Sequence, residues 1–210
     1  MRVLCACEQS QAVTKEFRRG GVECYSCDLL PASGGHPEWH IQCDALEVAK
    51  MDWDMVIAFP PCTHLAVSGA KHFEEKRRNG KQQMAIGFFL AFTALDHVPR
   101  VCIENPVGIM STEYRKPTQI ISPWMFGDPQ EKKTCLWLKG LPKLEPTKVV
   151  EPERRVEVGT QGHTMSEWYA EASNLPHYYR SIARAVTFPG IARAMARQWG
   201  NLLEPDPTLF

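Results

Sequence analysis

The stretch Met55-Val56-Ile57-Ala58-Phe59-Pro60-Pro61-Cys62 is the most informative part of this 210-residue chain. Its first four residues form a short apolar run that predicts a strand. The two prolines fix φ at about −65° and donate no backbone hydrogen bond, so the chain leaves the sheet there in a set direction. Cys62 is thereby placed at the carboxyl end of a strand, which is where open α/β sheets bind their ligands.

Strands and helices alternate through the first half of the chain. Strands are predicted over 2–7, 22–27, 40–43, 53–59 and 100–103, with helices over 9–19 and about 82–97. This alternation favours βαβ units, a parallel sheet and right-handed crossovers. In the first helix Ser10 is the candidate N-cap, and Gly20-Gly21 ends the helix.

The later part of the chain has a different pattern. Residues 134–138 are strand-like, whereas 143–165 are rich in Pro, Glu and Arg and predict an exposed connector. Phe188-Pro189-Gly190 opens a last helix. We expect one domain over 1–210, with a connector over 139–180 and a C-terminal helix over 182–200.

Composition narrows the classes of function. Lys and Arg number 24, as do Asp and Glu, so any nucleic-acid contact must be a local patch. The apolar start of the chain breaks at Glu8, which is not typical of a secretory signal. The longest apolar run, 84–95, is shorter than the about 20 residues of a membrane-spanning helix. We expect a soluble, cytoplasmic protein without membrane contact; its oligomeric state is left open.

Eight cysteines require an interpretation. A disulfide framework is not expected without a secretory signal. Cys24-Tyr25-Ser26-Cys27 has the spacing of zinc ligands, but its two cysteines would point to different sides of a strand. Buried thiols that pack as small hydrophobic side chains are the favoured interpretation, with a zinc site as the alternative. No metal is therefore predicted.

An acidic residue follows each of the first three strands: Glu8, Asp28 and Asp44. In a doubly wound sheet, an acid after the second strand suits ribose hydroxyls, and one after the third suits an adenine amino group. Asp is also a common turn former, but the three together favour a nucleoside cofactor. The first turn, Cys7-Glu8-Gln9-Ser10, has no glycine-rich phosphate cradle. That indicates a cofactor without phosphates, such as S-adenosylmethionine.

The strand over 100–103 runs into Glu104-Asn105-Pro106. A thiol and a carboxyl group on neighbouring strand ends suggest covalent catalysis assisted by an acid. Cysteine is suited to the nucleophile because its thiolate is intrinsically reactive, and Glu104 is the candidate acid if burial raises its pKa. The alternatives are a packed Cys62 with Glu104 capping a helix, or a cysteine hydrolase using His64, for which no third orienting residue is evident.

On these residues the chain resembles the DNA (cytosine-5) methyltransferases, in a compact form such as bacteriophages and prophages carry. Phe59-Pro60-Pro61-Cys62 resembles the nucleophile motif, and Glu104-Asn105-Pro106 resembles the Glu-Asn-Val motif that binds the base. Residues 65–69 resemble the loop that closes over the base, 130–134 the Gln-x-Arg-x-Arg strand, and 188–199 the helix that returns to the cofactor pocket. The usual Phe-x-Gly-x-Gly turn is replaced by Ala6-Cys7-Glu8-Gln9-Ser10. Only about 40 residues separate Trp137 from Arg180, too few for a separate target-recognition domain.

The resemblance implies a Rossmann-like, seven-stranded methyltransferase sheet with helices on both faces. The implied activity is S-adenosylmethionine-dependent methylation of carbon 5 of cytosine in DNA, with Cys62 as nucleophile, Glu104 as acid and Asn105 as support. Lys132 stands at the first arginine position and joins the catalytic set. Cofactor contacts are expected from Ala6, Cys7, Glu8, Asp28, Leu29, Asp44, Ala45 and Pro60. Nucleic-acid contacts are expected from Ser68, Lys71, Arg77, Arg78 and Lys133.

Other interpretations stay open at this point. The charged run 71–81 is also typical of a solvated loop. The same chemistry on a free pyrimidine nucleotide such as dCMP would explain the missing recognition domain. A non-catalytic DNA-binding protein that keeps the methyltransferase fold is the more distant alternative, favoured by the altered first turn.

Overall fold

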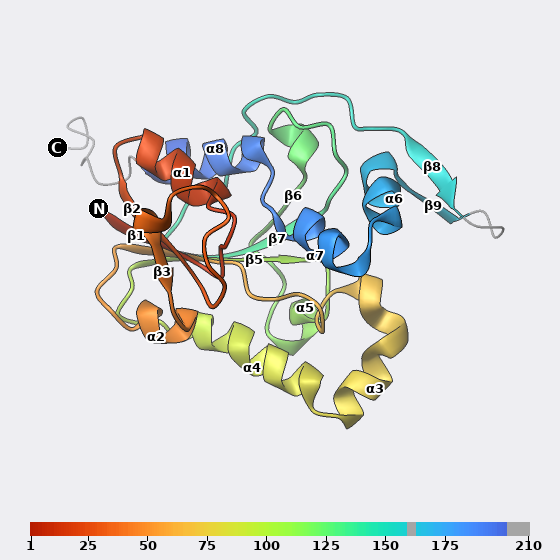
Figure 1. The fold of residues 1–210 in the computed structure, drawn as a ribbon, viewed down its shortest axis with the longest axis horizontal. Coiled ribbons are helices and arrows are strands. Elements are labelled where there is room, and N and C mark those ends of the chain that lie inside the picture. The colour runs from red at the N-terminus through yellow and green to blue at the C-terminus, as the bar shows by residue number, and fades with distance from the viewer. Residues whose placement is uncertain (159–162, 201–210) are drawn as a thin grey trace.

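A seven-stranded sheet forms the centre of the computed structural model, which describes residues 1–158 and 163–200 (Figure 1). The strand order is β3-β2-β1-β4-β5-β7-β6. The strands are β1 (Arg2–Ala6), β2 (Glu23–Asp28), β3 (His40–Gln42), β4 (Met55–Ala58), β5 (Arg100–Pro106), β6 (Gln119–Ile121) and β7 (Thr134–Lys139). The first five run parallel, and β7 is antiparallel to both β5 and β6. The predicted α/β class with a Rossmann-like seven-stranded sheet is confirmed.

Helices cover both faces of this sheet. Helices α1 (Ala12–Arg19) and α8 (Pro189–Trp199) lie on one face, and α2 (Ala45–Ala49) and α4 (Lys81–Thr93) lie on the other (Figure 1). Side chains alternate along β1, so that Val3 and Cys5 pack in the core beneath α1 and α8, whereas Leu4 and Ala6 pack toward α2 and α4. This is the double-sided burial that makes strands of a parallel sheet continuously apolar.

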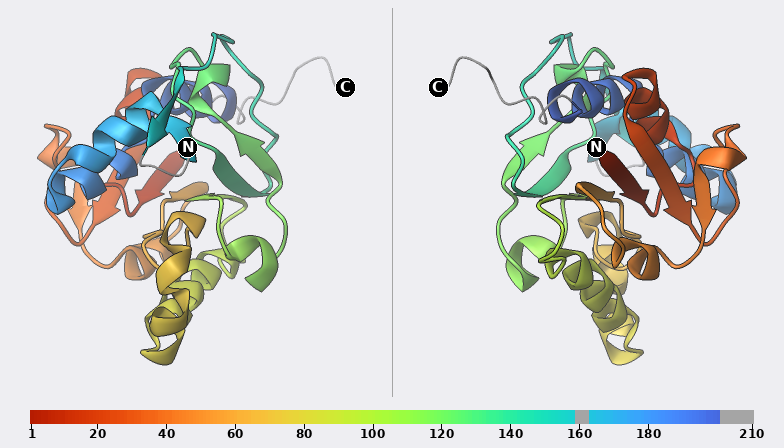
Figure 2. Two further views of the ribbon diagram at one scale, coloured as in Figure 1. Left: turned by 90° about the vertical axis from the view of Figure 1, so that its right-hand side faces the viewer. Right: turned by 90° about the vertical axis from the view of Figure 1, so that its left-hand side faces the viewer.

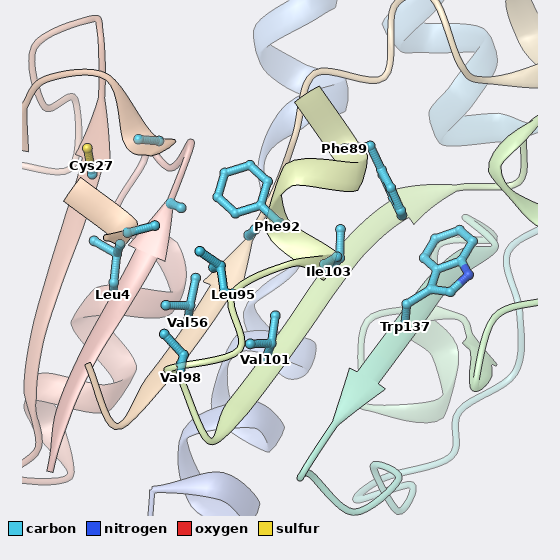
Figure 3. Close-up of a cluster of buried hydrophobic side chains, with 14 of the residues drawn as sticks. Leu4, Cys27, Val56, Phe89, Phe92, Leu95, Val98, Val101, Ile103 and Trp137 are labelled. Carbon is cyan, nitrogen blue, oxygen red and sulfur yellow. The ribbon is translucent and has the colours of Figure 1, made fainter. Parts of the chain in front are cut away.

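The core beneath α4 is closed by large aromatic side chains (Figure 3). Phe89 and Trp137 meet edge to face, with ring centroids 5.0 Å apart, and both are almost fully buried. Phe92, Val101 and Ile103 complete the contact between α4 and β5 in this cluster. The helix therefore holds β5 against its neighbours, and the carboxyl end of β5 carries Glu104 and Asn105.

The first helix begins at Ala12 rather than at Gln9, because Gln11 has left-handed backbone angles with φ 57°. Ser10 is not the helix cap: its Oγ accepts only a long bond of 3.4 Å from the Ala12 amide. The cap is the carboxylate of Glu8, which accepts hydrogen bonds from the amides of Val13 and Thr14 at 2.6 and 3.2 Å. A side chain from the preceding turn thus replaces the local N-cap that the sequence predicted.

Three segments differ clearly from the sequence prediction. The segment that leads into and includes the charged run forms a 3-10 helix η2 (Val67–His72) and a helix α3 (Phe73–Arg78), which together with the start of α4 project from the body of the protein (Figure 2). The connector contains the β8 (Arg155–Val158) and β9 (His163–Ser166) hairpin, followed by α6 (Glu167–Asn174). The predicted helix over 182–200 is two helices, because α7 (His177–Ala185) ends where Val186 turns extended ahead of Pro189.

Three short elements complete the chain: η1 (Pro37–Trp39), α5 (Met110–Glu113) and η3 (Pro123–Met125). No helix in the described ranges is both long and apolar enough to cross a bilayer.

The cysteines of the first two strands are buried. Cys24 lies in the core beneath α1 and α8, whereas Cys27 lies in the core on the opposite face of the sheet. Within residues 1–158 and 163–200, no three His, Cys, Asp or Glu side chains are grouped so that they could hold a metal ion.

Candidate active site

The turn after β4 and the end of β5 are joined by one buried hydrogen bond. Asn105 is 1% exposed, and its Nδ2 donates to the carbonyl oxygen of Pro60 at 2.7 Å. Strands β4 and β5 are neighbours in register, with Ala58 opposite Ile103, so their carboxyl ends lie side by side. The bond exists because Pro60 has a free carbonyl where the strand ladder has stopped. It holds the Pro60-Pro61-Cys62 turn against the residue that follows Glu104.

The loop after Cys62 is pinned to the segment after β5. The Cys62 carbonyl accepts hydrogen bonds from the amides of Leu65 and Ala66, both at 2.9 Å. The Leu65 carbonyl in turn accepts from the Ile109 amide at 3.0 Å, and a Cβ on Gly108 would lie 2.3 Å from that same carbonyl oxygen. Only glycine allows the two backbones to approach so closely. The position of the thiol is therefore set by two loops packed together.

Cys62 is half-buried in a mixed electrostatic environment. Burial is the main reason that the pKa of its thiol is raised, and the nearby Glu104 carboxyl raises that pKa further. Lys132 and Arg184 act in the opposite direction and lower it. These four side chains therefore lie within electrostatic reach of one another, and a thiolate at Cys62 depends on the two cations.

The surroundings of Glu104 favour the protonated form of its carboxyl group. Burial is the main cause that raises the pKa of its carboxyl group, and Lys132 opposes the rise. A protonated carboxyl beside a thiol can donate a hydrogen bond to a substrate atom while the sulfur attacks. The structure thus brings together the predicted catalytic residues Cys62, Glu104, Asn105 and Lys132.

Lys132 precedes β7 and reaches a later part of the chain. Its Nζ donates to the carbonyl oxygen of Arg184 at 2.8 Å and lies 5.9 Å from the centroid of the Phe188 ring. This contact fastens the end of α7 beside the catalytic residues. Sequence reasoning missed Arg184, because nothing in its local pattern shows that α7 would meet a residue 52 positions earlier.

Except for Pro60, which follows β4, the predicted cofactor residues lie at the carboxyl ends of the first three strands. Cys7 has φ 60°, a conformation that favours glycine. Burial is the main reason that the pKa of its thiol is raised, and Asp28, Cys27 and Asp44 raise that pKa further. Cys7 is therefore within electrostatic reach of both aspartates. One carboxylate oxygen of Asp28 accepts from the Leu30 amide at 2.9 Å, and one of Asp44 accepts from the Leu46 amide at 2.8 Å.

The remaining residues of this set differ in exposure. Leu29 is 71% exposed, whereas Ala6 and Ala45 are buried, as is Pro60. Glu8 is 4% exposed and, besides the two amides of α1, accepts a hydrogen bond from the Thr14 hydroxyl at 2.6 Å. The carboxyl group of Glu8 is therefore occupied in holding the first turn to α1. A cofactor at this turn would contact other atoms of the turn.

The predicted nucleic-acid contacts come from three segments. Arg77 and Arg78 stand in the last turn of α3, and Ser68 is exposed in η2, whereas Lys133 is exposed just ahead of β7. The side chain of Lys71 lies outside the described residues. A further cation, Lys76, was not predicted; its Nζ donates to the carbonyl of Thr63 at 2.7 Å, next to Cys62. Its only sequence signal was membership of the charged run.

His64 has surroundings unlike those of a base in a cysteine hydrolase. Burial, followed by Lys76 and Lys81, lowers the pKa of its imidazole. Its Nδ1 is buried, and no hydrogen-bond partner for it is found among the residues that the structure describes. The groups that shift the pKa of the Cys62 thiol are Glu104, Lys132 and Arg184, and His64 is not one of them.

Comparisons with known proteins give structural likeness only. No protein-family model matches the chain, and no curated protein matches it. Similar solved structures include a methyltransferase of Entamoeba histolytica, EhMeth, with a TM-score of 0.49 and 14% identity over 71% of this chain and 57% of that one. The Dnmt2 methyltransferase of S. pombe has a TM-score of 0.44 and 13% identity over 68% and 50% of the two chains.

A triple mutant of DNMT2 from Spodoptera frugiperda has a TM-score of 0.43 and 15% identity, over 72% of this chain and 57% of that one. The chain thus spans about half the length of the solved structures it matches. Likeness at this level does not define an activity, since one fold hosts many functions. The chemistry has to be derived from the residues of the site.

Proposed function

We propose that the protein transfers a methyl group from S-adenosylmethionine to carbon 5 of cytosine in DNA, through a covalent adduct on Cys62. The observation that carries this proposal is the 2.7 Å hydrogen bond from the Asn105 side chain to the Pro60 carbonyl. It couples the turn that bears the thiol to the strand end that bears Glu104. A nucleophile and an acid held on adjacent strand ends suit addition to an electron-poor ring.

The first turn supports a cofactor without phosphates. In dinucleotide-binding sheets, the pyrophosphate sits on the free amides at the start of the first helix. Here the amides of Val13 and Thr14 are taken by the buried carboxylate of Glu8. A phosphate would meet a carboxyl group instead of free donors. Asp28 and Asp44 beside Cys7 remain suited to hydroxyl and amino groups of an adenosine.

The proposed mechanism assigns a step to each residue. The Cys62 thiol loses its proton to water, aided by Lys132 and Arg184, and its Sγ bonds to carbon 6 of the ring. Protonated Glu104 donates to ring nitrogen 3, so that the ring electrons move to carbon 5. Bound S-adenosylmethionine would supply the methyl group for carbon 5 and leave as S-adenosylhomocysteine. Loss of the carbon 5 proton to water returns the electron pair that expels Sγ as a thiolate, and ring nitrogen 3 gives its added proton back to Glu104.

The short segment after β7 bears on the substrate. The described part of residues 139–188 contains the β8–β9 hairpin and the helices α6 and α7, so a large recognition surface is not part of our proposal. A base in duplex DNA would have to be flipped out at a cost of a few kcal/mol, most of which single-stranded DNA avoids. With so short a segment for recognition, single-stranded or loosely specified DNA suits the proposal better than a long palindrome. Our proposal also includes that the protein is a compact, phage-type member of this class, that residues 1–210 form one domain, and that it is cytoplasmic. Methylation of free dCMP is the variant that the short segment also favours.

The test is methyl transfer from labelled S-adenosylmethionine to DNA and, in parallel, to dCMP. Wild-type protein is compared with Cys62→Ala and with Cys43→Ala, a control at an exposed cysteine. We expect label with wild type and with Cys43→Ala, and none with Cys62→Ala. Equal incorporation by all three proteins would exclude the covalent mechanism. Absence of any heat on titration with S-adenosylmethionine would favour a non-catalytic protein.

A further inference from the structure

Arg184 stands at the end of α7, in the segment that takes up the space between β7 and the last helix. Helices α6 and α7 lie toward the same end of the molecule as α3 and the loop after β4, as both views show (Figures 1 and 2). The carbonyl of Arg184 accepts the hydrogen bond from Lys132, two residues ahead of β7. Because Thr134 of β7 pairs with Pro106, this contact ties Arg184 to the strand end that bears Glu104.

The guanidinium group of Arg184 is held in place by neighbours without charge. It stacks over the ring of Tyr169, with Cζ 4.0 Å from the ring centroid, and Nη2 donates to the hydroxyl of Ser173 at 2.5 Å. Its Nε is buried, and no hydrogen-bond partner for this atom is found within residues 1–158 and 163–200. None of the ion pairs in those ranges includes Arg184.

Such an arrangement favours an anionic ligand. A half-buried cation with an unsatisfied donor loses solvation without the compensation of a partner charge. A guanidinium group that is already oriented by stacking loses little further entropy when it binds, and its fork of N–H groups matches a phosphate. Tyr169 and Ser173 therefore prepare Arg184 to bind an anion next to the site of the thiol.

We propose that Arg184 binds a phosphate group of the pyrimidine nucleotide whose base is presented to Cys62. The inference rests on the proposed function, which places a pyrimidine beside that thiol. It adds that the substrate must be phosphorylated, either within a strand or as a mononucleotide, and that a nucleoside is a poor substrate. The electrostatic influence of Arg184 on Cys62 agrees with the short span between a pyrimidine ring and its own phosphate.

The experiment measures binding of a labelled single-stranded oligodeoxynucleotide of about 12 residues with one cytosine, by fluorescence anisotropy at salt concentrations from about 50 to 200 mM. The proteins are wild type, Arg184→Ala, Arg184→Lys and Arg193→Ala, an exposed arginine of α8 as the matched control. For Arg184→Ala we expect weaker binding and a salt dependence (log–log slope) reduced by about 1, as for one lost phosphate contact. Arg184→Lys and Arg193→Ala are expected to keep the wild-type slope.

Competition by unlabelled dCMP and by deoxycytidine distinguishes a mononucleotide phosphate from a phosphate within a strand. If wild type is displaced by dCMP but not by deoxycytidine, and Arg184→Ala no longer distinguishes them, Arg184 binds a mononucleotide phosphate. If neither displaces the oligonucleotide while the slope changes as expected, Arg184 binds a strand phosphate. An unchanged slope together with unchanged competition in Arg184→Ala would overturn the inference.

Two further measurements show whether a variant has lost its fold and whether the proposed function itself fails. Arg184→Gln, which is neutral but similar in length, replaces the alanine variant if circular dichroism shows that the latter does not fold. Methyl transfer is measured on the same proteins. Wild type that binds with the expected slopes but methylates nothing refutes the proposed function alone. Wild type that methylates, with a variant slope unchanged, refutes only the role of Arg184.

Discussion

The hydroxyl of Thr14 donates a 2.6 Å hydrogen bond to the buried carboxyl group of Glu8, six residues earlier in the chain. Two backbone amides of α1 donate to the same group. These bonds favour the charged carboxylate, but burial outweighs them and raises the pKa of Glu8 from its usual 4.5 to about 7. A group at the turn of the proposed cofactor site therefore titrates near neutral pH.

The raised pKa of Glu8 predicts a stability that falls as pH rises. Between pH 4.5 and about 7 the unfolded chain has released this proton while the folded protein still holds it, so the free energy of unfolding decreases, by about 3 kcal/mol in all, and then levels off. We expect Glu8→Gln to lose this part of the pH dependence, as measured by urea unfolding across that range. Glu23→Gln, at an exposed site, is the control, and an equal slope in both variants would contradict the prediction.

Removal of the Asn105 amide is expected to affect stability and activity together. Asn105→Ala leaves the buried Pro60 carbonyl without its donor, which costs about 1–3 kcal/mol, and frees the turn that holds Cys62. Urea unfolding and labelled methyl transfer are measured on the same protein. Asn174→Ala, at an exposed residue near the end of α6, should match wild type in both. Full activity of Asn105→Ala would show that this bond does not position the thiol.

Gly108→Ala tests the packing of the two loops. Its Cβ would lie 2.3 Å from the Leu65 carbonyl oxygen, so the segment after Cys62 must move. We expect methyl transfer to fall by at least about tenfold, since a small misplacement of a reacting group has a large effect. Gly87→Ala is the contrasting variant, because an added Cβ there meets nothing within 4 Å and lies inside α4. It should stabilise the protein by about 0.5–1 kcal/mol and leave activity unchanged.

The reactivity of the Cys62 thiol should depend on the charged side chains near it. We expect Glu104→Gln to shift the alkylation of Cys62 by iodoacetamide to lower pH. The thiol loses its proton at higher pH than the carboxyl group, so at that point Glu104 carries a negative charge that raises the thiol pKa, and glutamine removes that charge. Lys132→Gln should shift it to higher pH. Peptide mass spectrometry gives the rate at each pH, and the exposed Cys43 in the same sample is the internal control. If both variants had the wild-type profile of alkylation rate against pH, these charges would not influence the thiol.

A fluorine at carbon 5 of cytosine should trap the proposed adduct. Carbon 5 then carries no proton to lose, so the thiolate cannot be expelled and the Sγ–carbon 6 bond persists after methyl transfer. Wild type incubated with S-adenosylmethionine and DNA that contains 5-fluorocytosine should gain the mass of the strand, and Cys62→Ala should not. Only free protein in the mass spectrum of the wild type would count against the mechanism.

Local patterns were sufficient for the first half of the sheet. The apolar runs 55–58 and 100–103 became β4 and β5, and Pro60-Pro61 ended β4 where the sequence placed the end. The adjacency of these two strands followed from the βαβ pattern, and it brought Cys62 and Glu104 to one edge. Apolar runs, turn residues and helix stops act within a few residues, so each can be read from its own neighbours.

Other features depended on contacts between distant segments. β6 was not predicted: it has only three residues and exists because β7 pairs with it. Glu8 became the cap of α1 only because the backbone at Gln11 is left-handed, which places the helix amides over its carboxylate. Arg184 reached the catalytic residues through Lys132, across 52 positions of sequence.

By itself, the sequence determined the strand and turn that present the thiol and the strand that presents the carboxyl group, since both depend on short-range sterics and apolar periodicity. Tertiary structure alone decided that Arg184 joins the charges around Cys62 and which oxygen holds Asn105. Those contacts form between segments whose spacing along the chain carries no signal, because their free energy comes from burial and pairing in the finished fold.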